Sequence, residues 1–123
     1  MSGRILVVED QEDNRRIMRD LLTSAGYEMI EALTGESGVE RADADRPDLI
    51  LMDIQLPGLD GYEATRRIKA NPDLRRIPVI AVTSYALSGD EQKAQDAGCD
   101  GYVAKPFSPR ALLATIRTFL PEA

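Results

Sequence analysis

The chain has 123 residues, 43% of them hydrophobic, which is enough for one compact domain with its own core. Its 21 acidic and 15 basic residues leave a net charge of −6, which repels the phosphates of nucleic acids and anionic membrane surfaces. Histidine is absent, which excludes an imidazole base, a histidine phosphocarrier and a histidine-ligated metal.

Cysteine content and apolar run lengths indicate the compartment. The single cysteine cannot form an internal disulfide, and the first residues lack the layout of a signal peptide. No apolar run approaches the roughly 20 residues that a membrane-spanning helix needs. We therefore expect a cytoplasmic protein that binds neither nucleic acid nor membrane.

Short apolar segments rich in Val and Ile alternate with longer segments of helical period, which is typical of βα units around a parallel sheet. The first, third and fourth of these apolar segments (4–8, 48–52 and 78–82) favour central strands covered on both faces. The second (27–32) alternates between apolar and polar residues and favours an edge strand. The five expected strands are residues 4–8, 27–32, 48–52, 78–82 and 102–104.

The helical segments carry start and stop signals. The first expected helix, 13–25, ends at Gly26, and the last, 109–120, has Ser108 at its cap position. A second helix is expected over 35–44, while capping-box spacing starts the third near Asp60 and the fourth near Ser88. In the first helix, the expected buried stripe is Ile17, Met18, Leu21, Leu22 and Ala25, and the expected solvated face is Arg15, Arg16 and Arg19.

Polar residues follow four of the expected strands. They are Glu9 and Asp10, then Asp53, Thr83 and Lys105. Taken singly, each acid could be a helix cap or a turn residue. Because ligands of an open parallel sheet bind beyond the carboxyl ends of its strands, we expect all five side chains at one edge.

Three clustered carboxylates repel one another unless a cation lies among them. Oxygen ligands without His or Cys favour a hard ion, and Mg²⁺ fits because it accepts a few carboxylates and keeps waters that a phosphate can replace. Such an ion neutralises an incoming phosphoryl group and lets a neighbouring carboxylate act as the nucleophile. With Lys105 as a point charge and the Thr83 hydroxyl as a donor, the set predicts phosphoryl transfer onto an aspartate.

Four motifs carry a family resemblance. They are ILVVED (5–10), DLILMDIQLPGLDG (48–61), PVIAVT (78–83) and YVAKPF (102–107). In order and spacing, over residues 1–123, they resemble the CheY-like receiver domains of two-component response regulators. Within that family they most resemble single-domain regulators of the DivK type or receivers cut from hybrid kinases. The implied fold is flavodoxin-like α/β, with (βα)5 units, a five-stranded parallel sheet in the order 2-1-3-4-5, and helices on both faces.

The resemblance also implies roles for individual residues. Asp53 would accept the phosphoryl group, and Lys105 would contact it. Asp10, Asp53 and the backbone carbonyl of Gln55 would bind Mg²⁺, with Glu9 acting through water. Thr83 and Tyr102 would form the switch pair, and Gln55 and Tyr85 would tune dephosphorylation. The Lys105–Pro106 peptide bond would be cis, although only about 5–6% of the peptide bonds that precede proline in folded proteins are cis.

The implied function is a phosphorylation switch rather than an enzyme acting on another substrate. A histidine kinase or a His-containing phosphotransfer protein would dock near the first helix and phosphorylate Asp53. The signal would then pass to a separate downstream protein, because the chain ends just after the last helix. We expect a monomer or weak dimer.

Three alternatives stay open. A phosphohydrolase of the haloacid dehalogenase type needs an acid two residues after its nucleophile, where this chain has Gln55. A flavodoxin-like cofactor binder needs a phosphate-cradling loop after the first strand, where this chain is acidic. A pseudo-receiver would bind partners without being phosphorylated.

Overall fold

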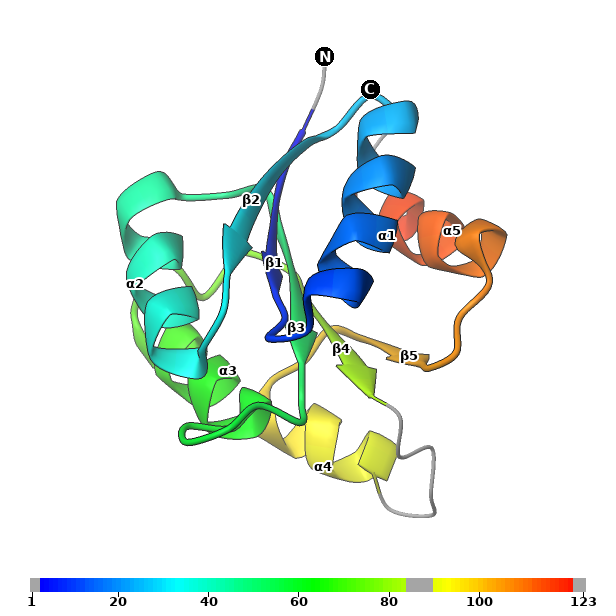
Figure 1. Cartoon of the computed structure of the whole chain (residues 1–123). Coiled ribbons are helices and arrows are strands. Elements are labelled where there is room, and N and C mark those ends of the chain that lie inside the picture. The colour runs from blue at the N-terminus through cyan, green and yellow to red at the C-terminus, as the bar shows by residue number, and fades with distance from the viewer. Residues whose placement is uncertain (1–2, 84–89, 121–123) are drawn as a thin grey trace.

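Within the residues that the structure describes, five strands alternate with five helices (Figure 1). The computed structural model describes residues 3–83 and 90–120. In chain order the elements are β1 (Arg4–Val8), α1 (Glu12–Ser24), β2 (Glu28–Ala32), α2 (Gly35–Asp45), β3 (Leu49–Asp53), α3 (Gly61–Ala70), β4 (Val79–Thr83), α4 (Asp90–Ala97), β5 (Gly101–Ala104) and α5 (Pro109–Phe119).

The strands form one sheet in the order β2-β1-β3-β4-β5, and each neighbouring pair is parallel. This confirms the predicted flavodoxin-like order and the edge position of β2. Every residue of β3 and β4 is buried, as their continuous apolar sequences indicate.

Two apolar clusters lie on opposite faces of the sheet. Helices α1 and α5 cover one face, where Met18, Leu22, Leu112 and Ile116 pack on alternate strand residues such as Ile5 and Leu51 (Figure 1). Helices α2, α3 and α4 cover the other, where Ala42, Ile68 and Ala94 meet the intervening strand residues such as Leu6 and Ile50. The period of two along each strand therefore builds both halves of the core.

The helix starts at Asp60 and Ser108 form as their sequences predict, and α2 begins with a cap that was not predicted. Ser108 accepts a hydrogen bond from the Ala111 backbone N–H at the start of α5, and Asp60 accepts one from Glu63 at the start of α3. Thr34 and Ser37 form a capping box at the start of α2. The predicted start near Ser88 lies outside the described residues, as does Tyr85.

Two predictions for α1 were wrong. Ile17 was expected in the buried stripe, but it is 53% exposed, because α1 rests on the sheet through Met18 and Leu22. Arg15 was expected on the solvated face, but it is only 8% exposed. Burial of its guanidinium is tolerated because each of the three guanidinium nitrogens donates a hydrogen bond to an oxygen.

None of the helices in the described ranges, 3–83 and 90–120, combines the length and the apolar character that crossing a bilayer requires.

Candidate functional site

Strand pairing places the predicted site residues together at the carboxyl ends of the strands. Val8 pairs with Met52, so Glu9 and Asp53 follow neighbouring positions on β1 and β3. Asp53 pairs in turn with Val82, and Thr83 with Ala104. The carboxyl ends of β1, β3, β4 and β5 therefore carry the five predicted side chains together.

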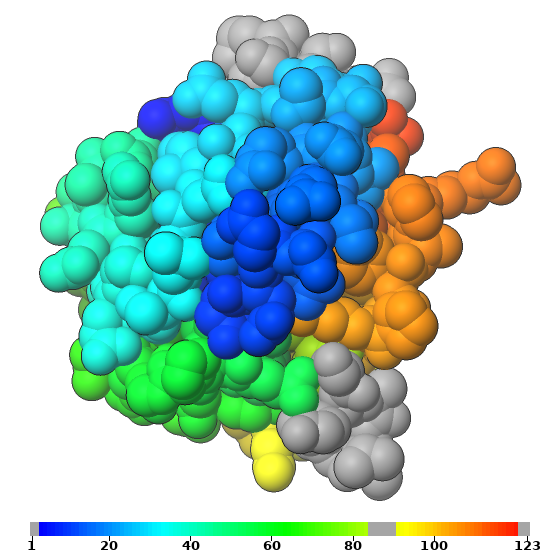
Figure 2. Space-filling view, viewed as in Figure 1, coloured from blue at the N-terminus to red at the C-terminus, as the bar shows by residue number. Residues whose placement is uncertain are grey.

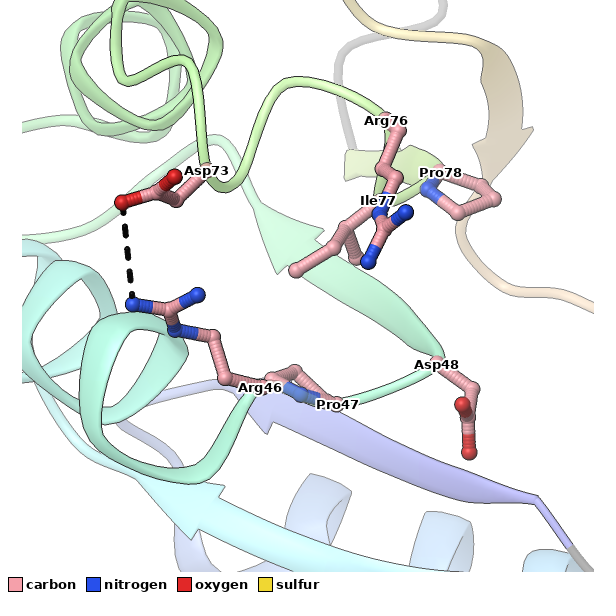
Figure 3. Close-up of a pocket in the computed structure, with 7 residues that line it drawn as sticks. All are labelled: Arg46, Pro47, Asp48, Asp73, Arg76, Ile77 and Pro78. Atoms are coloured by element: carbon pink, nitrogen blue, oxygen red, sulfur yellow. Dashed lines mark ion pairs between the residues drawn. The ribbon is translucent and has the colours of Figure 1, made fainter.

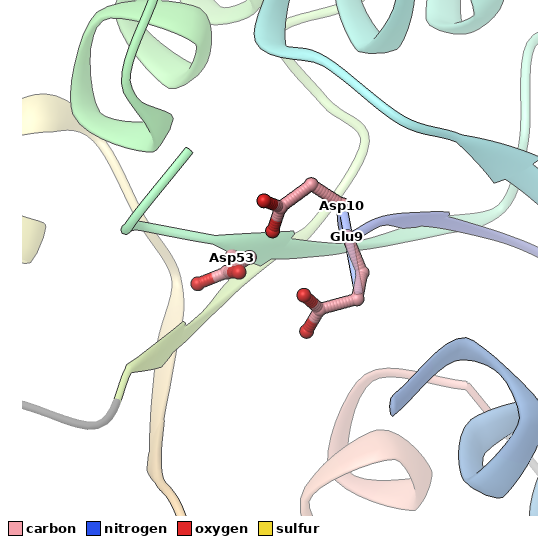
Figure 4. Close-up of side chains that lie close together, drawn as sticks. All are labelled: Glu9, Asp10 and Asp53. Carbon is pink, nitrogen blue, oxygen red and sulfur yellow. The ribbon is translucent and has the colours of Figure 1, made fainter. Parts of the chain in front are cut away.

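Three carboxylates form an acidic cluster, defined here as Glu9, Asp10 and Asp53. One oxygen of each lies within 4.8 Å of the others, and Figure 4 shows the three groups turned toward a common space at the end of β3. Glu9 and Asp53 are buried, and Asp10 is half-buried. Their mutual repulsion is strengthened by this burial, so the cluster favours a cation among its oxygens.

Lys105 supplies the positive charge of the site. Its Nζ lies 2.7 Å from Glu9 Oε1 and 3.6 Å from Asp53 Oδ2, and its side chain is only 14% exposed. The Lys105 backbone N–H donates to the Thr83 carbonyl at 2.7 Å, which fixes the chain just beyond β5. The following bond, Lys105–Pro106, is cis, as the family resemblance implies.

Backbone groups orient the two buried acids. The Gln55 N–H donates to Asp53 Oδ1 at 3.0 Å, and the Gln11 N–H donates to Glu9 Oε2 at 3.2 Å. The start of α3 comes so close that a Cβ on Gly61 would lie 2.3 Å from the Asp53 carbonyl oxygen. A glycine is therefore required for α3 to support the chain that follows Asp53.

Thr83 and Tyr102 lie on the same face of the sheet. Thr83 is buried, and Tyr102 pairs with Ala81, packing beside the cluster beneath α2, α3 and α4. Strand alternation turns the Thr83 side chain toward that same face. Both side chains therefore lie on the face of the sheet that α2, α3 and α4 cover, while the predicted switching role of the pair stays a prediction.

The donor set of the acidic cluster fits a hard divalent cation. It offers carboxylate oxygens only, which are ligands that Mg²⁺ prefers, and three such ligands would leave the other positions of an octahedral Mg²⁺ ion to water. The predicted contributions of the Gln55 carbonyl and of Glu9 through water stay predictions.

Arg15 touches the acidic cluster, and the sequence reasoning missed it. Its Nη1 donates to the Glu9 carbonyl at 3.0 Å, its Nε to Glu31 Oε1 at 3.2 Å, and its Nη2 to Glu12 Oε2 at 2.5 Å. One signal was available: Arg15 lies three residues before Met18 and seven before Leu22, the spacing of one helix face.

A cavity of about 330 Å³ lies at the opposite end of the sheet, where the chain enters β3 and β4. Figure 3 shows it between Arg46, Asp48, Asp73 and Arg76, with Arg46 and Asp73 forming an ion pair of 3.9 Å. Its two arginines are balanced by two aspartates, so it lacks the charge excess that marks the acidic cluster.

The lone cysteine is protected by its surroundings. Burial raises the pKa of the Cys99 thiol, against the effect of a contact with the Thr65 hydroxyl at 3.8 Å. The thiolate, which is the reactive form of a cysteine, is therefore disfavoured at Cys99.

The doubly wound sheet with acids at its carboxyl edge is the architecture of CheY-like signalling domains. It superposes on Vibrio cholerae CheY4 with a TM-score of 0.91 at 27% identity, covering 98% of this chain and 100% of that one. The family model described as response regulator receiver domain matches residues 5–117, and the chain belongs to this family. It is thus a two-component response regulator by descent.

Two relatives refine this placement. The polar-differentiation response regulator DivK of Brucella anthropi is 44% identical over 123 residues, covering both chains completely. The receiver domain of the sensor histidine kinase PA1611 from Pseudomonas aeruginosa, solved with a magnesium ion coordinated in its active-site cleft, is 40% identical. It covers 97% of this chain and 98% of that one, with a TM-score of 0.90. The DivK-like resemblance of the motifs is confirmed, and the family favours signalling over the phosphohydrolase and cofactor-binding alternatives.

Proposed function

We propose that residues 1–123 form one receiver domain that accepts a phosphoryl group on Asp53 from a phosphohistidine. The observation that carries the proposal is the meeting of the three acidic oxygens within 4.8 Å with the Lys105 ammonium beside them. Mg²⁺ would be held by Asp10, Asp53 and the Gln55 carbonyl, with Glu9 acting through water, as PA1611's magnesium-bearing cleft supports. When bound, it neutralises charge on the phosphoryl group.

The protein's own groups account for the rest of the transfer. The P–N bond of the donor breaks as a P–O bond forms to an Asp53 carboxylate oxygen. Lys105 lies between Glu9 and Asp53, so its ammonium is within reach of a phosphoryl oxygen on Asp53. The Gln55 N–H holds the other side of the carboxylate in place. The Gln55 side chain also flanks the site, where it would tune the rate of Asp53 dephosphorylation.

The product acts as a switch and not as an intermediate of catalysis on another substrate. An aspartyl phosphate is a mixed anhydride that hydrolyses, so the signal limits itself. The Thr83 hydroxyl would move to donate a hydrogen bond to a phosphoryl oxygen. The Tyr102 ring would then turn inward to fill the space that the Thr83 side chain vacates. The surface near α4, β5 and α5 would then bind a downstream protein differently in the two states.

The surface beside Lys105 is suited to the phosphodonor. Asn14, Ile17, Lys105, Pro106 and Phe107 border an open depression of about 530 Å³. Figure 2 shows the start of α1 (blue) next to the chain beyond β5 (orange) on this face. The exposed Ile17 would anchor a histidine kinase or a His-containing phosphotransfer protein with its phosphohistidine directed at Asp53.

Two further features belong to the same proposal. One is that the protein is a monomer or weak dimer. The other is that it lies in the cytoplasm, which fits a chain whose single thiol, Cys99, is free, because free thiols persist in reducing compartments.

Acetyl phosphate with Mg²⁺ tests the proposal without a partner. Intact-mass spectrometry should show one added phosphoryl group on the wild type and on the control Asp20→Asn, an exposed aspartate of α1, and none on Asp53→Asn. Absence of the adduct from wild-type protein with a native circular dichroism spectrum would overturn the proposal and favour the pseudo-receiver.

A further inference from the structure

Arg15 connects the acidic cluster to two other elements. From the first turn of α1 it reaches the Glu9 carbonyl beyond β1, the Glu31 carboxylate on β2 and the Glu12 carboxylate within α1. It is one of the few charged residues in the described part of the chain that are buried. A buried guanidinium with three oxygen partners is held in place, because losing any of these hydrogen bonds would leave a buried donor without its partner.

Through its hydrogen bond to the Glu9 carbonyl, Arg15 holds the peptide group that joins Glu9 to Asp10. The Glu9 carbonyl is part of the bond that joins Glu9 to Asp10, and it lies just past the strand, where the ladder no longer pairs it. On the strand side, the Glu9 N–H still donates to the Ala32 carbonyl at 3.0 Å. Arg15 therefore fixes the first peptide beyond β1 after strand pairing has ended.

The Asp10 side chain has little else to orient it. Among the described residues, the contact that the Asp10 carboxylate makes is a hydrogen bond of 3.4 Å from the Gln11 side chain, at the outer limit for such a bond. Its direction is thus set mainly by its backbone. By contrast, Glu9 and Asp53 are held by backbone N–H groups and by Lys105.

We propose that Arg15 is a positioning residue, which holds the Glu9–Asp10 peptide so that the Asp10 carboxylate faces Asp53 and can bind a divalent cation there. The inference rests on the proposed function in one respect: the cation is the Mg²⁺ of the phosphorylation site. It assigns to Arg15 no contact with the metal or the phosphoryl group.

Charge and geometry predict opposite effects of removing Arg15. As a cation near a dication site, Arg15 acting through charge alone would weaken Mg²⁺ binding, so its removal would tighten binding. As the group that orients Asp10, it strengthens binding, so its removal would weaken binding. The carboxylates of Glu12 and Glu31 largely neutralise its charge, which leaves the geometric effect dominant.

The test compares Arg15→Met and Arg15→Lys with the control Arg19→Met. Arg19 shares Glu31 with Arg15, but its hydrogen bonds in the described part of the chain go to Glu31 and not to Glu9. Titration calorimetry with MgCl₂ should show binding about tenfold weaker for Arg15→Met, the usual loss on removing a group that orients a ligand. Arg15→Lys should also bind more weakly, since one ammonium cannot span three oxygens, and Arg19→Met should stay within about twofold of wild type.

A second measurement needs no metal. In ¹⁵N NMR spectra recorded in EDTA, the Asp10 amide, which belongs to the held peptide, should shift and exchange faster in both Arg15 variants but not in Arg19→Met. Mg²⁺ affinity equal to or tighter than wild type in a folded Arg15 variant would overturn the inference. If Arg15→Met fails to fold, Arg15→Lys decides by the same criterion. If wild-type protein binds no Mg²⁺, the proposed function fails, and the Asp10 amide alone then decides whether Arg15 holds the peptide.

Discussion

Asp10 is the acid of the cluster with no cation of its own. Lys105 lies 2.7 Å from Glu9 and 3.6 Å from Asp53, and no ion pair to Asp10 is found among the described residues. Without a bound dication, its negative charge is therefore a net repulsion within a partly buried group. A bound cation would relieve this repulsion, which favours cation binding at the site.

Asp10→Asn should stabilise the metal-free protein by about 1 kcal/mol, because it removes that repulsion while keeping the side-chain shape. With Mg²⁺ the order should reverse, since a ligand at 100 times its Kd stabilises the wild type by about 2.7 kcal/mol and the variant by less. Urea unfolding followed by circular dichroism, in EDTA and in MgCl₂, measures both effects. Asp20→Asn is the control, and a variant less stable than wild type in EDTA would contradict the argument.

At the scale of elements, Glu31 ties β2 to α1. Arg19 donates to it at 2.7 and 3.2 Å, and Arg15 at 3.2 Å. The hydrogen bonds from Arg19 lower the pKa of the Glu31 carboxyl below its ordinary value near 4.5, against an opposing effect of burial, with the charges of both arginines adding to the lowering. Because the folded state favours the ionised carboxylate, Glu31 contributes stability above pH 4.5, and the contribution is lost as pH falls through the lowered pKa.

Glu31→Gln should therefore lower the free energy of unfolding at pH 7 by about 0.5–1 kcal/mol, a modest amount because the pair is partly exposed. The difference from wild type should shrink as pH falls below 4.5. Urea titrations at several pH values measure it, with Glu40→Gln, an exposed glutamate of α2, as the control. A difference that is constant or grows toward low pH would show that the pairing does not act through ionisation.

Lys69 performs a similar role at the other end of the sheet. Its Nζ donates to the Arg75 and Ile77 carbonyls at 2.9 and 2.8 Å and to Asp100 Oδ2 at 2.8 Å. Asp100 in turn accepts from the Val79 N–H at 2.9 Å. One ammonium thus joins the last turn of α3 to the segments that lead into β4 and β5.

Lys69→Met should destabilise the protein by about 2–3 kcal/mol, because it leaves two carbonyls and a carboxylate without their shared donor. Arg66→Met, an exposed position on the same helix, is the matched control and should change stability by less than about 0.5 kcal/mol. Equal stabilities of the two variants in guanidinium unfolding would refute this role.

Across the whole molecule, the sheet is shared by two apolar clusters that do not touch directly. Each central strand gives alternate residues to the cluster beneath α1 and α5 and to the one beneath α2, α3 and α4. Loss of either cluster would expose one side of every central strand. The two layers are therefore expected to unfold as one cooperative unit.

Leu22→Ala and Ile68→Val test this, since both side chains are fully buried on opposite faces. The first should cost about 2–5 kcal/mol and the second about 0.5–1.5 kcal/mol. In the double variant the costs should add to within about 0.5 kcal/mol, with a single transition by fluorescence and by circular dichroism. Two separate transitions would mean that the layers unfold independently.

Much of the fold was predictable because hydrophobic period is a local property. The five strands were located to within one residue at each end, and the caps at Asp60 and Ser108 formed as predicted. The strand order came from the motif resemblance, since periodicity does not determine which strands pair. The convergence of Glu9, Asp10, Asp53 and Lys105 was also predictable, because they follow parallel strands.

What the sequence by itself determined is thus the alternation of elements and the chemistry at the strand ends, both properties of short segments. The tertiary structure alone decided which side chains of α1 are buried, reversing Arg15 and Ile17. Within the predicted group at the strand ends, it also decided that the Lys105 ammonium pairs most closely with Glu9, a residue 96 positions away. The physical reason is that burial of a charge depends on partners from other elements, and those partners meet only once the sheet has formed.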